Sequence, residues 1–507
     1  MAANFRMPST TSTCGICYPR CLLRLRRQPL EPLATVGKVA AKILFAISGD
    51  IYVRNYLQTD ALSELTRVHN VSVIASSALA LKQEVSHTPG FRGFFDPDPH
   101  IERRHQLLFS LLMWRNRRLS PTFFYRWMRN SHWDTISTKR GPVQWFIGFL
   151  RWIPGALINP AGLRIPLLGN RMVFPLVRKY LEKKLPVNPS IESLVRQELF
   201  DLIVYPSAAF DAASVDLARL GHTLKIPTLC LVDNWDNLTS KTTFWAKPDY
   251  LGVWGEQARE QACRIHSFPP DRVHPIGNPR FDEYFQYRNQ KPLESYAFPY
   301  LLFVGSAMPF DELGAIHLIE SLLARASAKA EKLTIVYRPH PWQQKRLSGS
   351  EFRESDFRRT ILDRQISEAY ASGVQRETTD TGFQPDLSYY PSLLSGATAV
   401  VGPLTTMLLE AALSLRPVVG LSYDDGIHEN TTRRYFSHFE GVENIPGFAI
   451  CESQSVLEEA LLNVLDSKKI SPSLSDSKTR FFVHQDEFSY STRLLKLVDS
   501  ILDGDEK

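Results

Sequence analysis

A run of polar and charged residues, VDNWDNLTSK at Val232–Lys241, directly follows an apolar run that predicts a buried strand at Ile226–Asp233. A loop at this point lies at the carboxyl end of its sheet, where α/β proteins bind ligands. An Asp there can take a proton from an acceptor hydroxyl as general base, and a Lys can neutralise a phosphate. Turns and helix caps favour the same residue types, but so many polar groups at one strand end favour a functional site. The residues predicted for it are Asp233 and Asp236 for catalysis, and Asn237 and Lys241 for acceptor binding.

A second motif, Arg338-Pro339-His340-Pro341, follows the apolar run LTIVY. The two prolines stiffen the loop and present the Arg and His side chains at fixed angles. Arg can donate two hydrogen bonds to a phosphate, and His can donate a hydrogen bond or a proton to a leaving group. The alternative is a structural loop with a hydrogen-bonded His. We predict that Arg338 binds a donor phosphate and that His340 is catalytic.

A third motif, Gly402-Pro403-Leu404-Thr405-Thr406, runs into the apolar segment MLLEAALSL. A strand, a tight turn and a helix that begins at Thr would leave free backbone N–H groups at the positive end of the helix dipole, which suits an anion. Glu410 lies one helical turn after Thr406 and could bind ribose hydroxyls. The alternative is an ordinary capped helix with an exposed Glu. The residues predicted to bind the donor here are Gly402, Thr405, Thr406 and Glu410.

A fourth segment, Gly277-Asn278-Pro279-Arg280-Phe281-Asp282, has the Gly and Asn of a tight turn. Its structural interpretation, a turn at a domain junction, is the stronger one, although Arg280 could reach a cleft and is predicted to bind the donor. Asp424-Asp425-Gly426 is treated in the same way, as a turn at a strand end.

The elements that must position these motifs alternate between strands and helices in two sets. The first set has apolar runs at Lys42–Ile47, from Val71, and at Asp201–Pro206, Ile226–Asp233 and Asp249–Gly255. A polar segment at Tyr287–Pro299 predicts a linker. The second set has runs at Tyr300–Ser306, Lys332–Pro341, Ala397–Pro403 and Arg416–Tyr423. Such alternation predicts parallel sheets covered by helices.

We therefore predict two Rossmann-like, doubly wound α/β domains that face a cleft. The N-terminal domain is expected at residues 36–286 and binds the acceptor, and the C-terminal domain at residues 300–477 binds the nucleotide donor. An amphipathic pattern predicts a C-terminal helix at residues 478–507. A chain of 507 residues with 44% hydrophobic and 22% charged residues fits a globular protein of this size.

The cysteines and residues 1–35 indicate the cellular compartment of the protein. Six cysteines in 507 residues do not indicate a disulfide scaffold and fit a reducing cytoplasm. Cys14, Cys17 and Cys21 lack a fourth metal ligand nearby. Residues 1–35 have no acidic residue before Glu31 and are interpreted as a disordered basic tail, although a targeting peptide has a similar composition.

Residues 101–190 are predicted to be a basic, aromatic helical insertion in the N-terminal domain. They contain 16 Lys and Arg residues, three acidic residues and five Trp residues. Cations interleaved with aromatic rings suit an anionic membrane surface. A helical insertion with a solvated basic face is an equal alternative. We expect no nucleic acid partner, because no recognition motif accompanies the charge.

Four segments occur in a fixed order along the chain: GNPRFD, RPHP, the Gly-Pro-Leu-Thr-Thr turn with EAALSLRPVV, and a Tyr-Asp strand end. Together they resemble the C-terminal half of GT-B fold transferases. The resemblance covers about residues 200–425. It is strongest to CDP-glycerol glycerophosphotransferase-like proteins and to capsule or surface-carbohydrate biosynthesis proteins. It implies that Arg338, His340, Thr405 and Thr406 approach the donor phosphates and that Glu410 lies near the ribose. It also implies that the acceptor binds beside Gly49 and Asp236.

Departures from that pattern leave the donor open. Glycerophosphotransferases of this type usually have a His-Gly pair where this chain has VDNWDN, so the base would be Asp236 or Asp233. The RPHP and Thr-Thr elements are also similar to those of sialyl- and Kdo-transferases, whose donors carry CMP. UDP, CMP and CDP donors therefore all remain open. GT-B enzymes generally need no bound metal, and we expect neither a metal nor a cofactor.

The resulting hypothesis is a cytoplasmic transferase, peripheral at the inner face of the plasma membrane. It would move a sugar or a sugar-like phosphate from a nucleotide-activated donor to a cell-surface polysaccharide, such as a capsule, or to a lipid-linked acceptor. The alternatives are a UDP-sugar epimerase of the same fold and a non-catalytic GT-B scaffold.

Overall fold

The computed structural model describes most of the chain after residue 39. The described residues are 40–133, 141–158, 160–207, 211–288, 295–325, 332–340, 352–365, 388–428, 431–465 and 470–504. The chain divides into the units Met1–Ala40 and Ala41–Lys507, and the described strands and helices all belong to the second. The predicted basic tail, with Cys14, Cys17 and Cys21, lies outside the described residues, as does part of the predicted linker.

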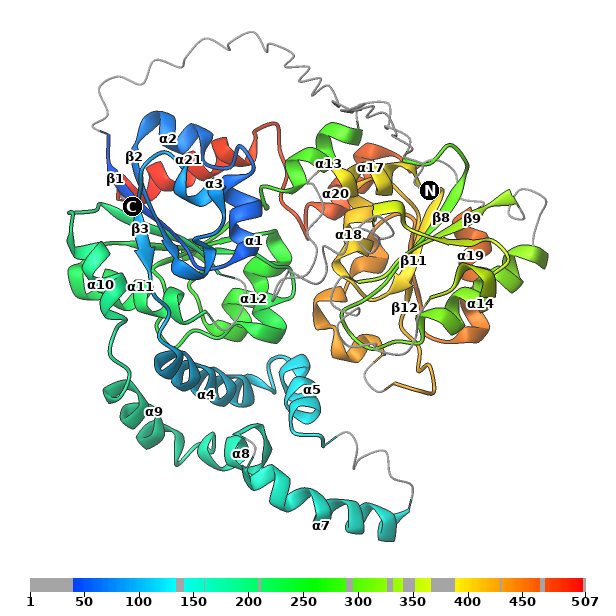
Figure 1. Cartoon of the computed structure of the whole chain (residues 1–507), viewed down its shortest axis with the longest axis horizontal. Helices are drawn as coiled ribbons and strands as arrows, with labels where there is room; N and C mark the ends of the chain where they lie inside the picture. Colours follow the sequence, from blue (N-terminus) through cyan, green and yellow to red (C-terminus); the bar gives the residue numbers. More distant parts are fainter. Residues whose placement is uncertain are drawn as a thin grey trace, which may run out of the picture. The chain divides into compact units, whose positions relative to one another are not determined.

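The N-terminal half contains a parallel seven-stranded sheet in the order β3-β2-β1-β4-β5-β6-β7 (Figure 1). Its strands are β1 (Lys42–Ile47), β2 (Asn70–Ser76), β3 (Phe91–Phe95), β4 (Leu202–Ser207), β5 (Thr228–Val232), β6 (Tyr250–Val253) and β7 (Val273–Pro275). Continuous apolar runs form the central strands because both faces of the sheet are covered. The covering helices include α2 (Ser63–Val68), α11 (Ala212–Leu224) and α12 (Glu256–His266).

The C-terminal half contains a parallel six-stranded sheet in the order β10-β9-β8-β11-β12-β13. Its strands are β8 (Tyr300–Val304), β9 (Thr334–Arg338), β10 (Thr360–Leu362), β11 (Ala399–Pro403), β12 (Val418–Leu421) and β13 (Phe448–Cys451). Separate apolar clusters cover its two faces. The helices include α14 (Glu312–Arg325), α17 (Tyr389–Gly396), α18 (Thr406–Leu413), α19 (Leu457–Leu465) and α20 (Pro472–Thr479). The prediction of two Rossmann-like α/β domains is confirmed.

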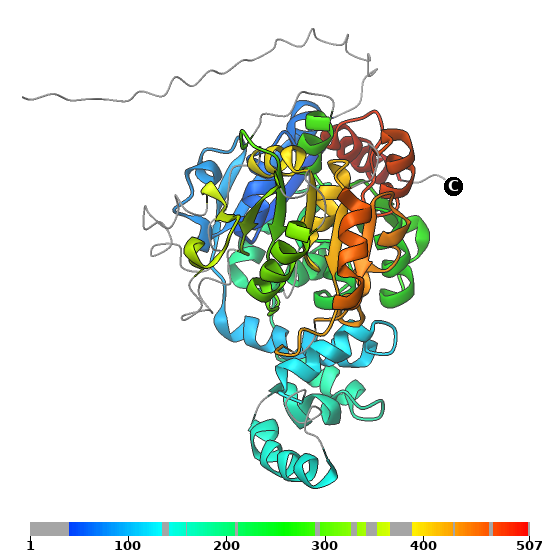
Figure 2. The same ribbon diagram turned by 90° about the vertical axis from the view of Figure 1, so that its right-hand side faces the viewer.

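The described residues between β3 and β4 are mostly helical. The helices are α4 (Pro99–Asn116), α5 (Pro121–Asn130), α7 (Pro142–Ile158), α8 (Ile165–Leu168), α9 (Phe174–Lys183) and α10 (Pro189–Arg196), with a π-type turn η3 (Pro160–Arg164) before α8. Each of α4, α5, α9 and α10 has Pro in its first turn, where the missing N–H costs nothing. Among the described helices, none is both long and apolar enough to cross a bilayer. Figures 1 and 2 show α7 beyond α4 and α5, on the side away from both sheets.

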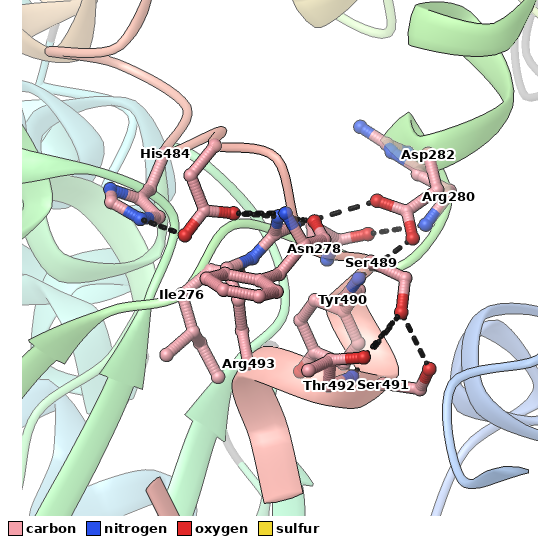
Figure 3. A network of polar contacts seen from close by, with 12 residues as sticks. Ile276, Asn278, Arg280, Asp282, His484, Ser489, Tyr490, Ser491, Thr492 and Arg493 are labelled. Carbon is pink, nitrogen blue, oxygen red and sulfur yellow. Dashed lines mark hydrogen bonds and ion pairs between the residues drawn. The ribbon is translucent and has the colours of Figure 1, made fainter. Parts of the chain in front are cut away.

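The C-terminal helix α21 (Tyr490–Leu502) returns to the N-terminal sheet. Its buried residues Leu494, Val498 and Ile501 join the apolar cluster that covers β1 and β2. Arg493 fixes the start of the helix, as Figure 3 shows: its Nε donates to the carbonyl of Ile276 at 2.9 Å, and its Nη2 lies 3.4 Å from Asp282 Oδ1. β1, β2 and the helix α21 therefore belong to one domain, although more than 400 residues separate them in sequence.

Hydrogen bonds join the two domains along one side. Gln257 Nε2, on α12, donates to the carbonyls of His438 and Glu440 at 3.0 Å each. The hydroxyls of Thr122, on α5, and Ser437 are 2.6 Å apart. These contacts bring the carboxyl ends of the strands of both sheets to a common cleft.

Candidate functional site

A cleft of about 530 Å³ lies between the two domains. The N-terminal domain lines it with residues that follow β1 and β5 and with α5, and the C-terminal domain with residues that follow β8, β9 and β11. Ligands of parallel α/β sheets bind at this edge, because the loops that follow the strands meet there.

Asp236 lies in the N-terminal wall, one residue before the π-type turn η4 (Asn237–Lys241). Its Oδ2 lies 2.9 Å from Lys241 Nζ and accepts a hydrogen bond from Ser240 Oγ at 3.0 Å. Burial by itself would raise the pKa of Asp236, but the Lys241 ammonium and the nearby His438 lower it to about 2. Asp236 is therefore ionised at neutral pH and is a weak base.

The other polar residues of this loop divide between the cleft and the interior. Asn234 and Lys241 line the cleft with Asp236, but Asp233 and Asn237 do not. Asp233 is fully buried and accepts from Asn55 Nδ2 at 3.0 Å, and Asn237 Nδ2 donates to the carbonyl of Ser207 at 3.1 Å. Both side chains hold the loop against β4 and the first helical turns.

Gly49, predicted to lie beside the acceptor, does not line the cleft either. It borders a second pocket of about 380 Å³ within the N-terminal domain, together with Ser48 and Asp211. Ser48 Oγ donates to Asp211 Oδ2 at 2.6 Å. Burial raises the pKa of Asp211 to about 6. Of the three residues predicted to bind the acceptor, Lys241 alone lines the cleft.

Arg338, Pro339 and His340 of the RPHP motif form part of the opposite wall, and Pro341 lies outside the described residues. Burial, and then the neighbouring Arg338 and Lys241, lower the pKa of His340 to about 4, so its imidazole is neutral at pH 7. Arg338 also borders the cleft, but it is buried, and its guanidinium pairs with Asp363 and donates to Tyr390 Oη at 3.0 Å. These two contacts hold Arg338 in place. To bind a phosphate, its guanidinium would have to donate further hydrogen bonds while it keeps both contacts.

Helix α18 presents its N-terminal end to the cleft. Thr405 and Thr406 line the cleft, and the N-cap residue Thr405 makes no side-chain capping hydrogen bond. The first N–H groups and the positive end of the helix dipole suit an anion. Gly402 has a packing role instead, because a Cβ there would lie 2.1 Å from the carbonyl oxygen of Val304.

Arg280 and Glu410 meet across the cleft. Arg280 Nη2 lies 2.9 Å from Glu410 Oε1, and Tyr284 Oη donates to Glu410 Oε2 at 2.5 Å. All three residues line the cleft. Arg280 and Tyr284 belong to the GNPRFD segment and the helix α13 (Phe281–Arg288), so this contact also joins the two domains.

Three arginines that the sequence analysis did not single out also line the cleft: Arg54, Arg126 and Arg129. Arg126 Nη1 donates to the carbonyl of Ser240 at 2.8 Å, and burial lowers the pKa of this guanidinium to about 10. Among the described residues, the lining has six Arg or Lys side chains and two carboxylates. A concave surface of this charge attracts polyanions. The three-residue spacing of Arg126 and Arg129 was a usable signal, since it puts both on one helix face.

His438 is a second residue that the sequence analysis missed. It is 6% exposed, lines the cleft, and its ring lies 4.9 Å from that of Trp235. Its Nδ1 has no hydrogen-bond partner among the described residues. Burial lowers the pKa of His438 to about 4, against the opposing effect of Asp236. A neutral imidazole therefore stands near the Asp236 carboxylate. Within the described part of the chain, no three His, Cys, Asp or Glu side chains are grouped to hold a metal ion.

In comparisons of sequence, neither a family model nor a curated protein matches this chain. Among solved structures, the UDP-GlcNAc 2-epimerase from Methanocaldococcus jannaschii is similar over 90% of this chain and 99% of its own, with 12% identity and a TM-score of 0.46. The UDP-N-acetylglucosamine 2-epimerase from Rickettsia bellii is similar over 92% and 98%, with 13% identity and a TM-score of 0.47. The glycotransferase of kitacinnamycin is similar over 92% and 100%, with 10% identity and a TM-score of 0.47. The strand order of the two sheets defines the fold, and the lining of the cleft defines the candidate site.

Proposed function

We propose that this chain transfers a sugar, or a sugar-like phosphate, from a nucleotide-activated donor to a hydroxyl of an acceptor that belongs to a cell-surface polysaccharide or its lipid carrier. The observation that carries the proposal is the cleft of about 530 Å³ at the carboxyl ends of two parallel sheets. Its excess of cationic side chains and the start of α18 suit the phosphates of a nucleotide, and its volume suits a nucleotide-sized ligand.

In this proposal the donor phosphates bind at Thr405 and Thr406 and near Lys241. His340, neutral at pH 7, donates a hydrogen bond to the phosphate that leaves. Glu410 has two oxygens with further acceptor capacity beside Arg280 and Tyr284, and it accepts from the ribose hydroxyls. The cations stabilise the negative charge that develops on the departing phosphate.

The proton of the acceptor hydroxyl needs a base. With a pKa of about 2, Asp236 is a weaker base than the neutral imidazole of His438, whose pKa is about 4. We assign the proton to His438, and Asp236 then stabilises the imidazolium that forms. The acceptor oxygen bonds to the transferred group, the bond from that group to the donor phosphate breaks, and the electron pair leaves with the phosphate.

Nucleotide binding tests this proposal first. Thermal unfolding of the full chain would be measured with UDP, CMP, CDP or GDP, for the wild type, for His340→Ala, and for His222→Ala as a control at an exposed histidine. One nucleotide at a hundredfold excess over its Kd is expected to stabilise the wild type and the control by about 2.7 kcal/mol. The shift should be smaller in His340→Ala. If no nucleotide stabilises any of the three, the donor site is wrong and a non-catalytic scaffold replaces the transferase.

Incubation of the wild type with nucleotide-sugars in the absence of acceptor tests the rival reaction. A transferase is expected to leave the sugar configuration unchanged. Conversion of a UDP-sugar to its epimer without any acceptor would replace the proposal with an epimerase.

A further inference from the structure

Large apolar side chains are exposed together on α7, α8 and α9. Of the 20 exposed large hydrophobic residues in the described part of the chain, 12 lie between residues 143 and 180. Val143, Ile158 and Met172 are 69%, 80% and 86% exposed. Single exposed apolar residues are ordinary, whereas such a concentration marks a site of interaction. We name residues 141–184 the α7–α9 surface.

Helix α7 is apolar around most of its circumference. Among its described side chains, Trp152 and Ala156 are buried, and Arg151 is its single charged residue. The rings of Trp145 and Phe149 stack with centroids 5.3 Å apart. A helix of this composition is normally covered by protein or lipid, so the exposed face calls for a partner.

The charge of the α7–α9 surface indicates which partner. Its sequence contains seven Arg or Lys residues and one acidic residue, Glu182, which pairs with Arg178 at 2.7 Å. Arg164, Arg171 and Lys183 are exposed beside the apolar residues. Aromatic and aliphatic side chains that enter the boundary of a bilayer, with cations that meet lipid phosphates, are the elements of an interfacial membrane site. We infer that the α7–α9 surface binds an anionic lipid bilayer.

The same helices connect this surface to the cleft. Apolar residues of α4, α8 and α9 pack in one cluster, which includes Leu108, Ile165 and Phe174. Helix α5 follows α4, contacts η3, and contributes Tyr125, Arg126 and Arg129 to the cleft lining. Helix α5 therefore packs on the α7–α9 surface and also lines the cleft. The inference that the acceptor is carried by the membrane depends on the proposed function, whereas the inference of lipid binding does not.

Flotation with vesicles tests the inference. The full chain would be incubated with vesicles of phosphatidylcholine alone or with phosphatidylserine added, at low and at high salt. We expect binding to the vesicles with phosphatidylserine and weaker binding at high salt. The double variant Phe146→Ser, Ile147→Ser should bind the vesicles at least about tenfold more weakly than the wild type, because two apolar side chains no longer enter the bilayer. Lys179→Glu with Lys183→Glu should abolish the preference for phosphatidylserine.

Matched controls lie outside the surface. Leu81→Ser with Leu199→Ser removes two exposed apolar side chains, and Lys478→Glu with Arg480→Glu reverses two exposed charges. Both should bind vesicles like the wild type, and every variant should unfold at about the wild-type temperature without any ligand, because all the substituted residues are exposed. Wild-type protein that ignores both kinds of vesicle would overturn the inference. So would a dimer in solution that the Phe146 and Ile147 changes dissociate, since a second copy would then cover the surface.

Discussion

At the scale of single residues, the chemistry of the cleft depends on which groups are ionised at neutral pH. Asp236 is ionised because the Lys241 ammonium offsets its burial, whereas His340 and His438 are neutral because burial disfavours their charged forms. The anionic group is thus a poor proton acceptor, and the neutral imidazoles are the available ones. In the proposed reaction His438 therefore accepts the proton, and Asp236 stabilises the imidazolium that forms.

Replacement of His438 by Asn should therefore lower kcat by roughly 10²- to 10⁴-fold, the usual contribution of a general base, with a smaller effect on donor KM. The wild-type kcat/KM should fall as the pH falls through the pKa of His438, because only the neutral imidazole accepts a proton. In Asp236→Asn this acidic limb should move to lower pH, since the carboxylate raises the pKa of His438. Steady-state kinetics against pH measures both effects, with His222→Asn as control. Wild-type kcat in His438→Asn would assign the proton elsewhere.

At the scale of elements, the C-terminal helix α21 depends on one buried cation. Arg493 is 7% exposed and contacts the Ile276 carbonyl, Asp282 and Asp486, while the backbone N–H of Tyr490 donates to Asp282. Four of these five residues are labelled in Figure 3, and they join α21 to the segment that carries Arg280. Burial raises the pKa of Asp282, so its charged form needs the guanidinium beside it.

Arg493→Met should lower the free energy of unfolding by about 3 kcal/mol, because two partly buried carboxylates lose their guanidinium partner and the Ile276 carbonyl loses its donor. Chemical denaturation of the full chain measures the change. Arg480→Met, at an exposed arginine on the preceding segment, should change stability by less than about 0.5 kcal/mol. Equal stability of both variants would show that apolar packing alone holds α21 to the sheet.

The strands differ in how well the sequence predicts them, and their position in the sheets explains the difference. The central strands, such as β1, β5, β8 and β11, are buried on both faces and are continuous apolar runs. The strands that the sequence analysis missed, β3, β7, β10 and β13, are the edge strands of the two sheets. They are short and partly exposed, so no continuous apolar run identifies them.

The same reasoning applies to the candidate site. Asp236, His340 and Thr405 follow predicted central strands, and the structure brings them to one cleft. Sequence could not separate Asp236 from Asp233, because a loop's side chains divide between interior and cleft according to packing. Sequence also could not identify His438, which lies in a short 3-10 turn, Ser437–Phe439. This turn is about 200 residues after β5 in sequence, and only folding brings the two together.

At the scale of the whole molecule, buried histidines make stability depend on pH. Burial lowers the pKa of His105, His266, His340 and His438 to about 4 in each case. The unfolded chain, with an ordinary His pKa near 6.5, binds more protons between pH 6.5 and 4, so stability falls as the pH falls through that window. Asp211 and Asp216, whose pKa values burial raises to about 6 and about 7, bind protons in the folded state and offset part of this loss.

His266 isolates this effect away from the cleft. Its Nε2 lies 2.7 Å from the Leu238 carbonyl, and its ring packs against Phe123 and Phe244, with Lys247 as the nearby cation that also lowers its pKa. Gln at this position keeps a donor for the carbonyl and never ionises. Between pH 7 and pH 5 the wild type should therefore lose about 2 kcal/mol more stability than His266→Gln. Urea unfolding at a series of pH values measures the difference. The exposed control His222→Gln should follow the wild type, and parallel curves for all three proteins would mean that His266 titrates in the folded chain as it does in water.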